Sequence, residues 1–530
     1  MVAHAERKTV CTITINSSDE KETFRRNLPE SDYEFVELVE RGKPDWFGSA
    51  CRKDVRCDVL VVSGHFDDGT EFYSDRLGAR ESLPVDAMER AACSRSCPSV
   101  FAQLKEVYLF GCNTLEPAPL RLASGEIPRS LIRSGYSAAD AERFARELEQ
   151  AYGESNRDRM RRVFKDVPVI YGFSSKAPLG AAAGPALERY FRAGPDTEFG
   201  SGRASARLVS TLAGASMTAT PGVRDSDPDA SARRDMCELA DERASAAQKL
   251  AFVHRLLARE TAEVRMQLDR IEKYVASLTA AERLRSDVVE ALRDIADDEG
   301  ARERYLAFAR DADALSTRAR MTDLAAALGW LTPAEKRIEL ARMFGDRLRA
   351  RDVGVTEVDL ACSLNDDHAL DAERMRLGAA NADRVAPAAV LACLGSADAR
   401  TRVLRALASA DADEVRIAQT YLRHRPLADP GELAEVAGAV LRMDASEAQV
   451  RALETLAGYR LSDRQTLEGL TRLFSLAKSV DVQRAIAGVL IRSDTAGMAS
   501  AALARTLRTH RLKSPDGADV IDILIRRLSS

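Results

Sequence analysis

Hydrophobic positions divide the chain into two parts with different periodicities. In the first part, short runs of β-branched and aromatic residues are bounded by turn residues, and they cover 9–15, 33–39, 59–62, 107–110 and 167–173. Short runs that are apolar at consecutive positions are typical of strands buried on both faces of a parallel sheet. Helical patterns between them, at 20–26, 85–92, 98–104, 138–152 and 185–191, predict a helix-flanked α/β fold with a mostly parallel sheet.

The second part shows helical periodicity only, and it is rich in Ala, Leu, Arg and Glu, which favour helix. An apolar stripe along residues 247–278 predicts either one long helix or a pair. Three similar segments begin at Val415, Val450 and Val482, at intervals of 35 and 32 residues. Repeats of this length, built from two helices each, are typical of an α-solenoid.

Between the two parts, residues 213–235 are dominated by Thr, Pro, Gly, Asp, Ser and Arg, a composition that favours a linker. A chain of 530 residues is also too long for a single hydrophobic core. We therefore expect an α/β domain over residues 1–212, a linker over 213–235 and an all-α helical-repeat domain over 236–530.

Charge and composition exclude some classes of partner. A formal net charge of -5 gives no electrostatic reason to expect nucleic acid, and no run of about 18 apolar residues predicts a membrane span. We therefore expect a cytoplasmic protein. The nine cysteines have no regular spacing, so the sequence predicts free thiols in a reducing compartment.

Two reactive side chains follow two neighbouring apolar runs. His65 comes after the run at 59–62, Cys112 comes after the run at 107–110, and a glycine precedes each. If the two strands are adjacent and parallel, both side chains emerge at the carboxyl edge of the sheet, where open α/β folds place their sites. A cysteine attacks as its thiolate, and a neighbouring histidine can accept the thiol proton and return it to a leaving amine.

These motifs resemble a known group of enzymes. Ser63-Gly64-His65 resembles the histidine motif of metacaspases, and Phe110-Gly111-Cys112-Asn113 resembles the cysteine motif of separase and bacterial CHAT domains. The resemblance to the caspase-like cysteine peptidases covers about residues 9–195. It implies a caspase-like α/β domain in which His65 and Cys112 are catalytic and the backbone N–H groups of residues 66 and 112 form the oxyanion hole. Phe66 stands where the family usually has glycine, which affects the shape of the site.

The resemblance also implies a function: an endopeptidase that cleaves a specific protein partner, without metal or cofactor. Ser174 and Ser175 follow the fifth strand and resemble positions that shape the substrate pocket, although an ordinary strand-to-helix turn explains them equally well. The helical repeats resemble HEAT repeats, which implies a surface that binds a regulatory protein or recruits the substrate. Related bacterial proteins act in signalling or antiphage defence, and bacterial gasdermins are among their substrates.

Other interpretations stay open. A catalytically inactive caspase-like scaffold is the main alternative, and Phe66 is its best argument. Zinc ligation by four cysteines is another; they are Cys51, Cys57, Cys93 and Cys97. Three acids can either pair with a basic substrate side chain or lie in solvent; they are Asp67, Asp68 and Glu116. The chain contains no phosphate-binding glycine loop of the Walker type and no G-x-S-x-G elbow.

Overall fold

The computed structural model describes residues 7–38, 54–66, 69–75, 81–94, 98–119, 126–133, 135–193, 199–350, 352–371, 384–444, 446–495, 498–513 and 519–529. The chain forms two compact units. The first comprises Met1–Asp313 with Ala327–Trp330, and the second comprises Ala314–Ala326 with Leu331–Ser530. The first unit contains a mostly parallel sheet with helices, and the described part of the second is helical, as the two hydrophobic patterns predict.

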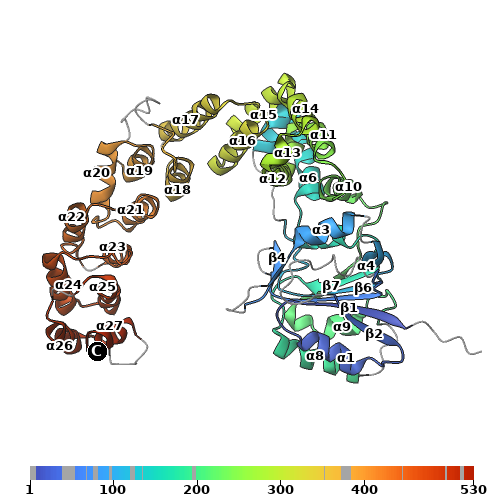
Figure 1. The fold of residues 1–530 in the computed structure, drawn as a ribbon, viewed down its shortest axis with the longest axis horizontal. Coiled ribbons are helices and arrows are strands. Elements are labelled where there is room, and N and C mark those ends of the chain that lie inside the picture. The colour runs from blue at the N-terminus through green and yellow to red at the C-terminus, as the bar shows by residue number, and fades with distance from the viewer. Residues whose placement is uncertain are drawn as a thin grey trace, which may run out of the picture. The chain divides into compact units, whose positions relative to one another are not determined.

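Six strands form the central sheet of the first unit (Figure 1). They are β1 (Lys8–Thr14), β2 (Tyr33–Glu37), β3 (Val59–Ser63), β6 (Glu106–Phe110), β7 (Val169–Phe173) and β8 (Met217–Thr220). They lie in the order β2-β1-β3-β6-β7-β8, and every neighbouring pair is parallel except β7 and β8. β3, β6 and β7 are buried at every position, which confirms that their apolar runs are strands covered on both faces.

Helices cover both faces of this sheet (Figure 1). One layer consists of α1 (Asp19–Asn27), α8 (Gly180–Arg192) and α9 (Ala206–Thr211); the other consists of α3 (Val85–Cys93), α4 (Pro98–Ala102) and α7 (Asn156–Val163). Side chains alternate along each strand because of the backbone pleat. In β3, Val59 and Val61 pack with the first layer, whereas Leu60 and Val62 pack with the second.

Further helices complete the first unit. They are α5 (Glu126–Arg133), α6 (Ala138–Tyr152), α10 (Ala230–Ala240), α11 (Ala246–Leu257), α12 (Thr261–Ser277), α13 (Ala280–Arg283), α14 (Ser286–Ala296) and α15 (Glu299–Asp311). The stripe over 247–278 thus forms a pair of helices rather than one. α12 packs against α5 and α6, so the α/β part and the first helices after it share one unit. A two-stranded hairpin, β4 (Glu71–Tyr73) and β5 (Ser82–Pro84), leads directly into α3.

The prediction of a linker over residues 213–235 is wrong. This segment forms a 3₁₀ turn at Ala213–Ala215, continues as β8, and enters α10 at Ala230. β8 is hydrogen bonded along β7 as the antiparallel edge of the sheet. A short edge strand is stabilised by the backbone ladder of its neighbour, so it needs no apolar run that composition would reveal.

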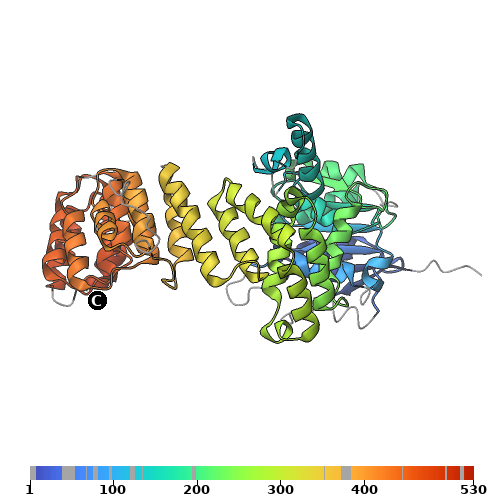
Figure 2. The same ribbon diagram turned by 90° about the horizontal axis from the view of Figure 1, so that it is seen from above.

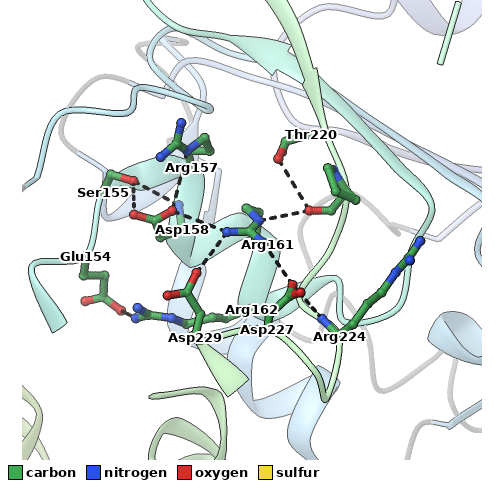
Figure 3. A network of polar contacts seen from close by, with 11 residues as sticks. Glu154, Ser155, Arg157, Asp158, Arg161, Arg162, Thr220, Arg224, Asp227 and Asp229 are labelled. Atoms are coloured by element: carbon green, nitrogen blue, oxygen red, sulfur yellow. Dashed lines mark hydrogen bonds and ion pairs between the residues drawn. The ribbon is translucent and has the colours of Figure 1, made fainter. Parts of the chain in front are cut away.

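A set of charged contacts fastens the stretch after β8 to α7 (Figure 3). The guanidinium of Arg161 donates to the carbonyl of Pro221 at 3.1 Å. It also donates to Asp229 at 2.9 Å and to Asp227 at 3.1 Å. All its nitrogens are therefore used to hold residues 221–229 in place, and this order is inconsistent with a flexible tether.

A second contact links α12 to the same region. Arg162 and Glu154 are both buried, and they form an ion pair at 3.1 Å (Figure 3). Arg270, from α12, contacts the same Glu154 carboxylate. Burial lowers the pKa of Arg162, and the negative charge of Glu154 opposes that shift. A buried carboxylate shared by two guanidinium groups makes α12 part of the α/β domain.

The second unit stacks its helices in two layers (Figures 1 and 2). Its helices are α16 (Leu315–Ala327), α17 (Pro333–Ala350), α18 (Val355–Leu364), α19 (Val385–Cys393), α20 (Ala397–Ala406), α21 (Ala412–His424), α22 (Pro430–Val440), α23 (Glu447–Leu456), α24 (Arg464–Leu476), α25 (Val480–Arg492), α26 (Ser500–His510) and α27 (Val520–Ser529). The three similar segments lie on α21, α23 and α25, which pack successively against one another. Each segment therefore occupies the same layer in consecutive helix pairs.

Among the residues that the structure describes, six cysteines are paired, so the prediction of free thiols is wrong for them. The disulfides are Cys11–Cys57, Cys93–Cys237 and Cys362–Cys393. Within the described ranges, Cys112 is the one free cysteine. Among the helices that the structure describes, none is both long enough and apolar enough to cross a bilayer.

The contacts of Arg161 predict the effect of removing its side chain. We expect Arg161→Ala to lower the free energy of unfolding of the first unit by about 2 kcal/mol, because it leaves two carboxylates without their cation. Urea unfolding followed by the fluorescence of the buried Trp330, which belongs to this unit, measures the change. Arg143→Ala, at an exposed pair on α6, is the matched control and should change stability little. Equal effects of the two variants would contradict the role assigned to Arg161.

Candidate active site

Three adjacent strands bring three polar side chains to one level of the sheet edge. The last residues of β1, β3 and β6 are paired with one another in register. Asn16, His65 and Cys112 each lie two residues beyond the end of their strand. All three line one cavity of about 50 Å³. The structure therefore brings the imidazole and the thiol together at the carboxyl edge, where the sequence pattern places them.

His65 is held by backbone and side-chain contacts. Its backbone N–H and C=O each hydrogen bond to Tyr73 of the β4–β5 hairpin at 2.9 Å, and the two rings lie 5.4 Å apart. On the imidazole, Nε2 lies 2.9 Å from Nδ2 of Asn16 and 3.4 Å from Oδ2 of Asp75. Without a proton, Nε2 can accept from the Asn16 amide, and with one it can donate to Asp75. The neutral ring can act as a base in the tautomer that carries its hydrogen on Nε2, where Asp75 is the partner, because a hydrogen bond accepted from Asn16 at Nε2 uses the lone pair that a base needs.

Cys112 sits in a turn that several elements fix. The next residue, Asn113, has a φ of 59°, in the left-handed region. Its backbone N–H donates to Ser175 O at 2.7 Å, and Asn156 donates to its carbonyl at 3.0 Å. The thiol sulfur accepts a hydrogen bond from the backbone N–H of Ala177 at 3.3 Å. This contact fixes the position of the sulfur at the cavity.

The glycine before Cys112 is required by close packing. A Cβ on Gly111 would lie 2.8 Å from Cβ of Phe66 and 3.0 Å from the carbonyl oxygen of Gly64. The backbone after β6 therefore runs directly against the backbone after β3. Phe66 itself is fully buried, and its ring lies 4.6 Å from that of Phe72 in the core. The Phe66 ring thus points away from the cavity and does not flank it.

Two backbone donors lie on either side of this turn. Neither the N–H of Phe66 nor the N–H of Cys112 has a hydrogen-bond acceptor among the residues that the structure describes. A Cβ on Gly111 would meet Phe66, so Phe66 and Cys112 lie in adjacent turns, of which Cys112 lines the cavity and Phe66 does not. Two N–H groups of this kind can hold the oxygen of a tetrahedral intermediate.

The predicted substrate-binding serines occupy a neighbouring turn. Ser174 donates from its backbone to Ser216 O at 3.1 Å, and the Ser175 hydroxyl lies 2.8 Å from that of Ser216. The cavity wall is instead formed by residues 177–180. A role of Ser174 and Ser175 in binding substrate stays a prediction.

Of the three acids named from the sequence, Glu116 is the one that the structure describes. Glu116 accepts a hydrogen bond from the backbone of Ala118 at 3.2 Å and does not line the cavity. Asp67 and Asp68 lie outside the described residues. The contacts of Glu116 give no support to its pairing with a basic substrate side chain. The same role for Asp67 and Asp68 stays a prediction.

A different acid lines the cavity. Glu20, in the first turn of α1, is 3% exposed, and its Oε2 has no hydrogen-bond partner among the described residues. Burial raises the pKa of Glu20 to about 7, and the charge of Asp19 adds to the shift, whereas hydrogen bonds from its own backbone N–H and from Ser63 oppose it. A buried carboxyl without a cation is costly to ionise, so Glu20 is a site that favours a positively charged group.

Sequence reasoning missed Asn16, Glu20 and Asp75. The reasoning that predicts His65 beside Cys112 also predicts Asn16 there, because β1 ends two residues before Asn16. Glu20 carried a weaker signal: it lies in the first turn of a helix that directly follows a buried strand. A hairpin arm at 71–74 is consistent with the local pattern, but the contact of Asp75 with His65 that follows from the hairpin is not.

The structure offers no support for zinc ligation. Cys57 and Cys93 are in disulfides, and disulfide sulfurs are not thiolate ligands. Cys51 and Cys97 lie outside the described residues. Within the described ranges, no group of three or more His, Cys, Asp or Glu side chains has the geometry to hold a metal ion.

Comparison with protein-family models, with curated proteins and with solved structures gives no match to this chain. The chemistry of the chain is therefore argued from its own contacts. The strongest of these are the register of three strands and the cavity shared by Asn16, Glu20, His65 and Cys112.

The raised pKa of Glu20 predicts a pH-dependent stability. Its carboxyl binds a proton more tightly in the folded state than its ordinary pKa of 4.5 allows in the unfolded chain. The resulting stabilisation is complete below pH 4.5 and is lost as the pH rises through about 7. Glutamine cannot ionise, so at pH 8 we expect Glu20→Gln to exceed the wild type in unfolding free energy by on the order of 3 kcal/mol.

Thermal and urea unfolding at pH 4 and pH 8 measure this difference. At pH 4 the two proteins should be equally stable, because the wild-type carboxyl is then neutral as well. Glu22→Gln, on the exposed face of the same helix, is the control and should show no such pH dependence. A gain for Glu20→Gln that is the same at both pH values would rule out ionisation of Glu20 as its cause.

Proposed function

We propose that this chain is a caspase-like cysteine endopeptidase in which Cys112 is the nucleophile and His65 the base. The observation that carries the proposal is the register of β1, β3 and β6, which sets Asn16, His65 and Cys112 side by side at the carboxyl edge of a parallel sheet. The motif resemblance of the sequence supports the same assignment. The comparisons add nothing to it, since they give no match.

In the proposed mechanism, the imidazole of His65 takes the proton of the Cys112 thiol, and the thiolate attacks the carbonyl carbon of a peptide bond. The N–H groups of Phe66 and Cys112 hold the oxygen of the tetrahedral intermediate. Collapse of this intermediate breaks the C–N bond, and the imidazolium returns the proton to the leaving amine. In the neutral ring Nε2–H donates to Asp75, so Nδ1 is the atom that takes the thiol proton, and Asp75 stabilises the resulting imidazolium. Water, deprotonated by His65, then hydrolyses the thioester.

Glu20 gives this proposal a substrate preference. Glu20 lines the cavity that holds the proposed catalytic pair, and its Oε2 has no hydrogen-bond partner in the part of the chain that the structure describes. A lysine or arginine side chain of the substrate would supply the missing cation and donors. We therefore propose cleavage next to a basic residue.

Entry of such a side chain requires the cavity to open. A volume of about 50 Å³ is roughly that of one or two water molecules. The wall formed by residues 177–180 includes Leu179, whose side chain is 71% exposed. Since Leu179 is not packed in a core, displacement of its side chain by a substrate would cost few buried contacts.

The second unit is proposed to be an α-solenoid of HEAT-like repeats that recruits a protein substrate or binds a regulator. Its support is the succession of α21, α23 and α25, which carry similar segments and stack in one layer. A bacterial gasdermin is a candidate substrate, with a role in signalling or antiphage defence. A cytoplasmic location is the part of this proposal that the three disulfides oppose, because disulfides persist mainly in oxidising compartments.

The alternative of an inactive scaffold rested on Phe66 as a bulky side chain over the site. The Phe66 ring lies in the core against Phe72, so it gives no reason to prefer the scaffold. No other contact of the described residues favours the scaffold over the peptidase.

Substitution of the catalytic pair tests the proposed activity. With a peptide library as substrate, we expect Cys112→Ala to abolish cleavage and His65→Ala to lower kcat/KM by about 10³-fold or more, because each removes the nucleophile or its base. His254→Ala is the matched histidine control, since that ring pairs with Asp298 at 3.0 Å on another helix and should leave kcat/KM unchanged. Cleavage that survives in Cys112→Ala, or no cleavage by the wild type under any condition, refutes the proposal.

Glu20→Gln tests the proposed preference separately. Loss of the buried charge should lower kcat/KM for peptides with Lys or Arg before the cleaved bond by about 30-fold or more. Peptides with a neutral residue there should be cleaved at the wild-type rate or faster. Glu22→Gln serves again as the control on the same helix. An equal loss on basic and neutral peptides would mean that Glu20 supports the site without selecting the substrate.

A further inference from the structure

One of the three described disulfides differs from the other two in its exposure. Cys93 is the last residue of α3 and Cys237 lies in the last turn of α10, and both are partly exposed. The remaining paired cysteines are buried to 1% exposure or less; they are Cys11, Cys57, Cys362 and Cys393. An external thiolate can therefore approach the Cys93–Cys237 sulfurs more readily than those of the other pairs.

A cation lies against these sulfurs. Arg233 is one helical turn before Cys237 on α10, so the two side chains share a face. Its Nη1 lies 2.6 Å from Sγ of Cys237 and 3.8 Å from Sγ of Cys93. Its Nη2 donates to the carbonyl of Ala92 at 3.4 Å, which holds the guanidinium between the two helices.

The position of Arg233 has a chemical consequence. A guanidinium next to a sulfur stabilises the thiolate and makes that sulfur a better leaving group in thiol–disulfide exchange. Among the described residues, no lysine or arginine donates to the sulfurs of the other two disulfides. Of the three described disulfides, Cys93–Cys237 is the one that is both partly exposed and in contact with an arginine.

We propose that Cys93–Cys237 is a thiol–disulfide exchange site whose co-reactant is a dithiol, with Arg233 as the residue that stabilises the leaving thiolate. One thiolate of the dithiol attacks Sγ of Cys93, the Cys93–Cys237 bond breaks, and Cys237 departs as a thiolate beside Arg233. The second thiolate of the dithiol then attacks the outer sulfur of the mixed disulfide and releases Cys93. Two electrons pass from the dithiol, which becomes a disulfide, to the cysteine pair, and the released thiolates equilibrate with protons from water.

The site lies at one end of a continuous path to His65. α3 begins at Val85, directly after β5, and the backbone of Val85 donates to Thr70 at 2.9 Å. β5 pairs with β4, whose Tyr73 is hydrogen bonded to His65 in both directions. Exchange at Cys93–Cys237 therefore removes the covalent link between α10 and α3, the helix that follows the His65 hairpin. The exchange chemistry itself does not depend on the proposed peptidase.

Timed reduction of the full chain tests the proposal. The native protein is incubated with dithiothreitol, samples are quenched with N-ethylmaleimide, and the remaining disulfides are reduced and labelled with an isotopic form of the same reagent. Mass spectrometry then gives the rate at which each cysteine opens. We expect Cys93 and Cys237 to open at least about tenfold faster than the two buried pairs.

Variants of Arg233 separate the effect of the cation from that of exposure. We expect Arg233→Ala to slow the opening of Cys93–Cys237 by about threefold to tenfold, and Arg233→Lys to stay within about twofold of the wild type. Arg234→Ala, which removes the adjacent exposed arginine, is the matched control and should leave the rate unchanged. If Arg233→Ala does not fold, Arg233→Gln, which removes the charge and keeps most of the side chain, takes its place, because the comparison of the three described disulfides in the wild type tests exposure alone.

Three outcomes would overturn the inference. Cys93 and Cys237 could be labelled before any reductant is added, which would mean that no disulfide is present. They could open no faster than Cys11 and Cys57. Finally, Cys93–Cys237 could open at the same rate in Arg233→Ala and Arg234→Ala. Exposure alone would then explain the fast opening, and the Arg233 guanidinium would contribute nothing. None of these outcomes bears on whether Cys112 cleaves peptides.

Discussion

The backbone ladder that joins β1, β3 and β6 is the constraint on which the candidate site depends. Because the three strands are parallel and their last residues are paired, the residues two positions beyond them meet at one level. A slip of one residue in either ladder would turn the side chains to the opposite face of the sheet. Gly111 adds to this constraint, since no larger residue allows the two turns to touch. The geometry of His65 and Cys112 is thus a property of the sheet rather than of two mobile loops.

Much of this arrangement follows from local sequence. The runs at 59–62 and 107–110 are β-branched and aromatic, and burial on both faces leaves little alternative to parallel central strands. Ser137 caps α6 as its side chain accepts from the backbone of Asp140, so the start of that helix is also a local property. The positions of His65 and Cys112 at one edge follow from these elements and from the rule for parallel sheets.

Other features depend on contacts that are distant in sequence. β8 has no apolar run and is a strand only because β7 offers it hydrogen bonds. Cysteine spacing alone does not reveal that Cys93 meets Cys237, since 144 residues separate them. Asp75 reaches His65 through a hairpin, and the pKa of Glu20 is raised by burial that only the folded chain creates. Phe66 shows the reverse case: the residue that argued against activity from the sequence has its ring in the core.

The carboxylate that Glu154 shares with Arg162 and Arg270 has a consequence for how the protein is made. The central strands are complete once β7 has been synthesised, but Arg270 follows about a hundred residues later. At ordinary rates of translation, that interval is roughly 5 to 20 seconds. During this time Glu154 has only one of its two cations, Arg162. The buried ion-pair cluster of the α/β part is therefore completed only after α12 has been synthesised, although α12 lies well beyond the last parallel strand.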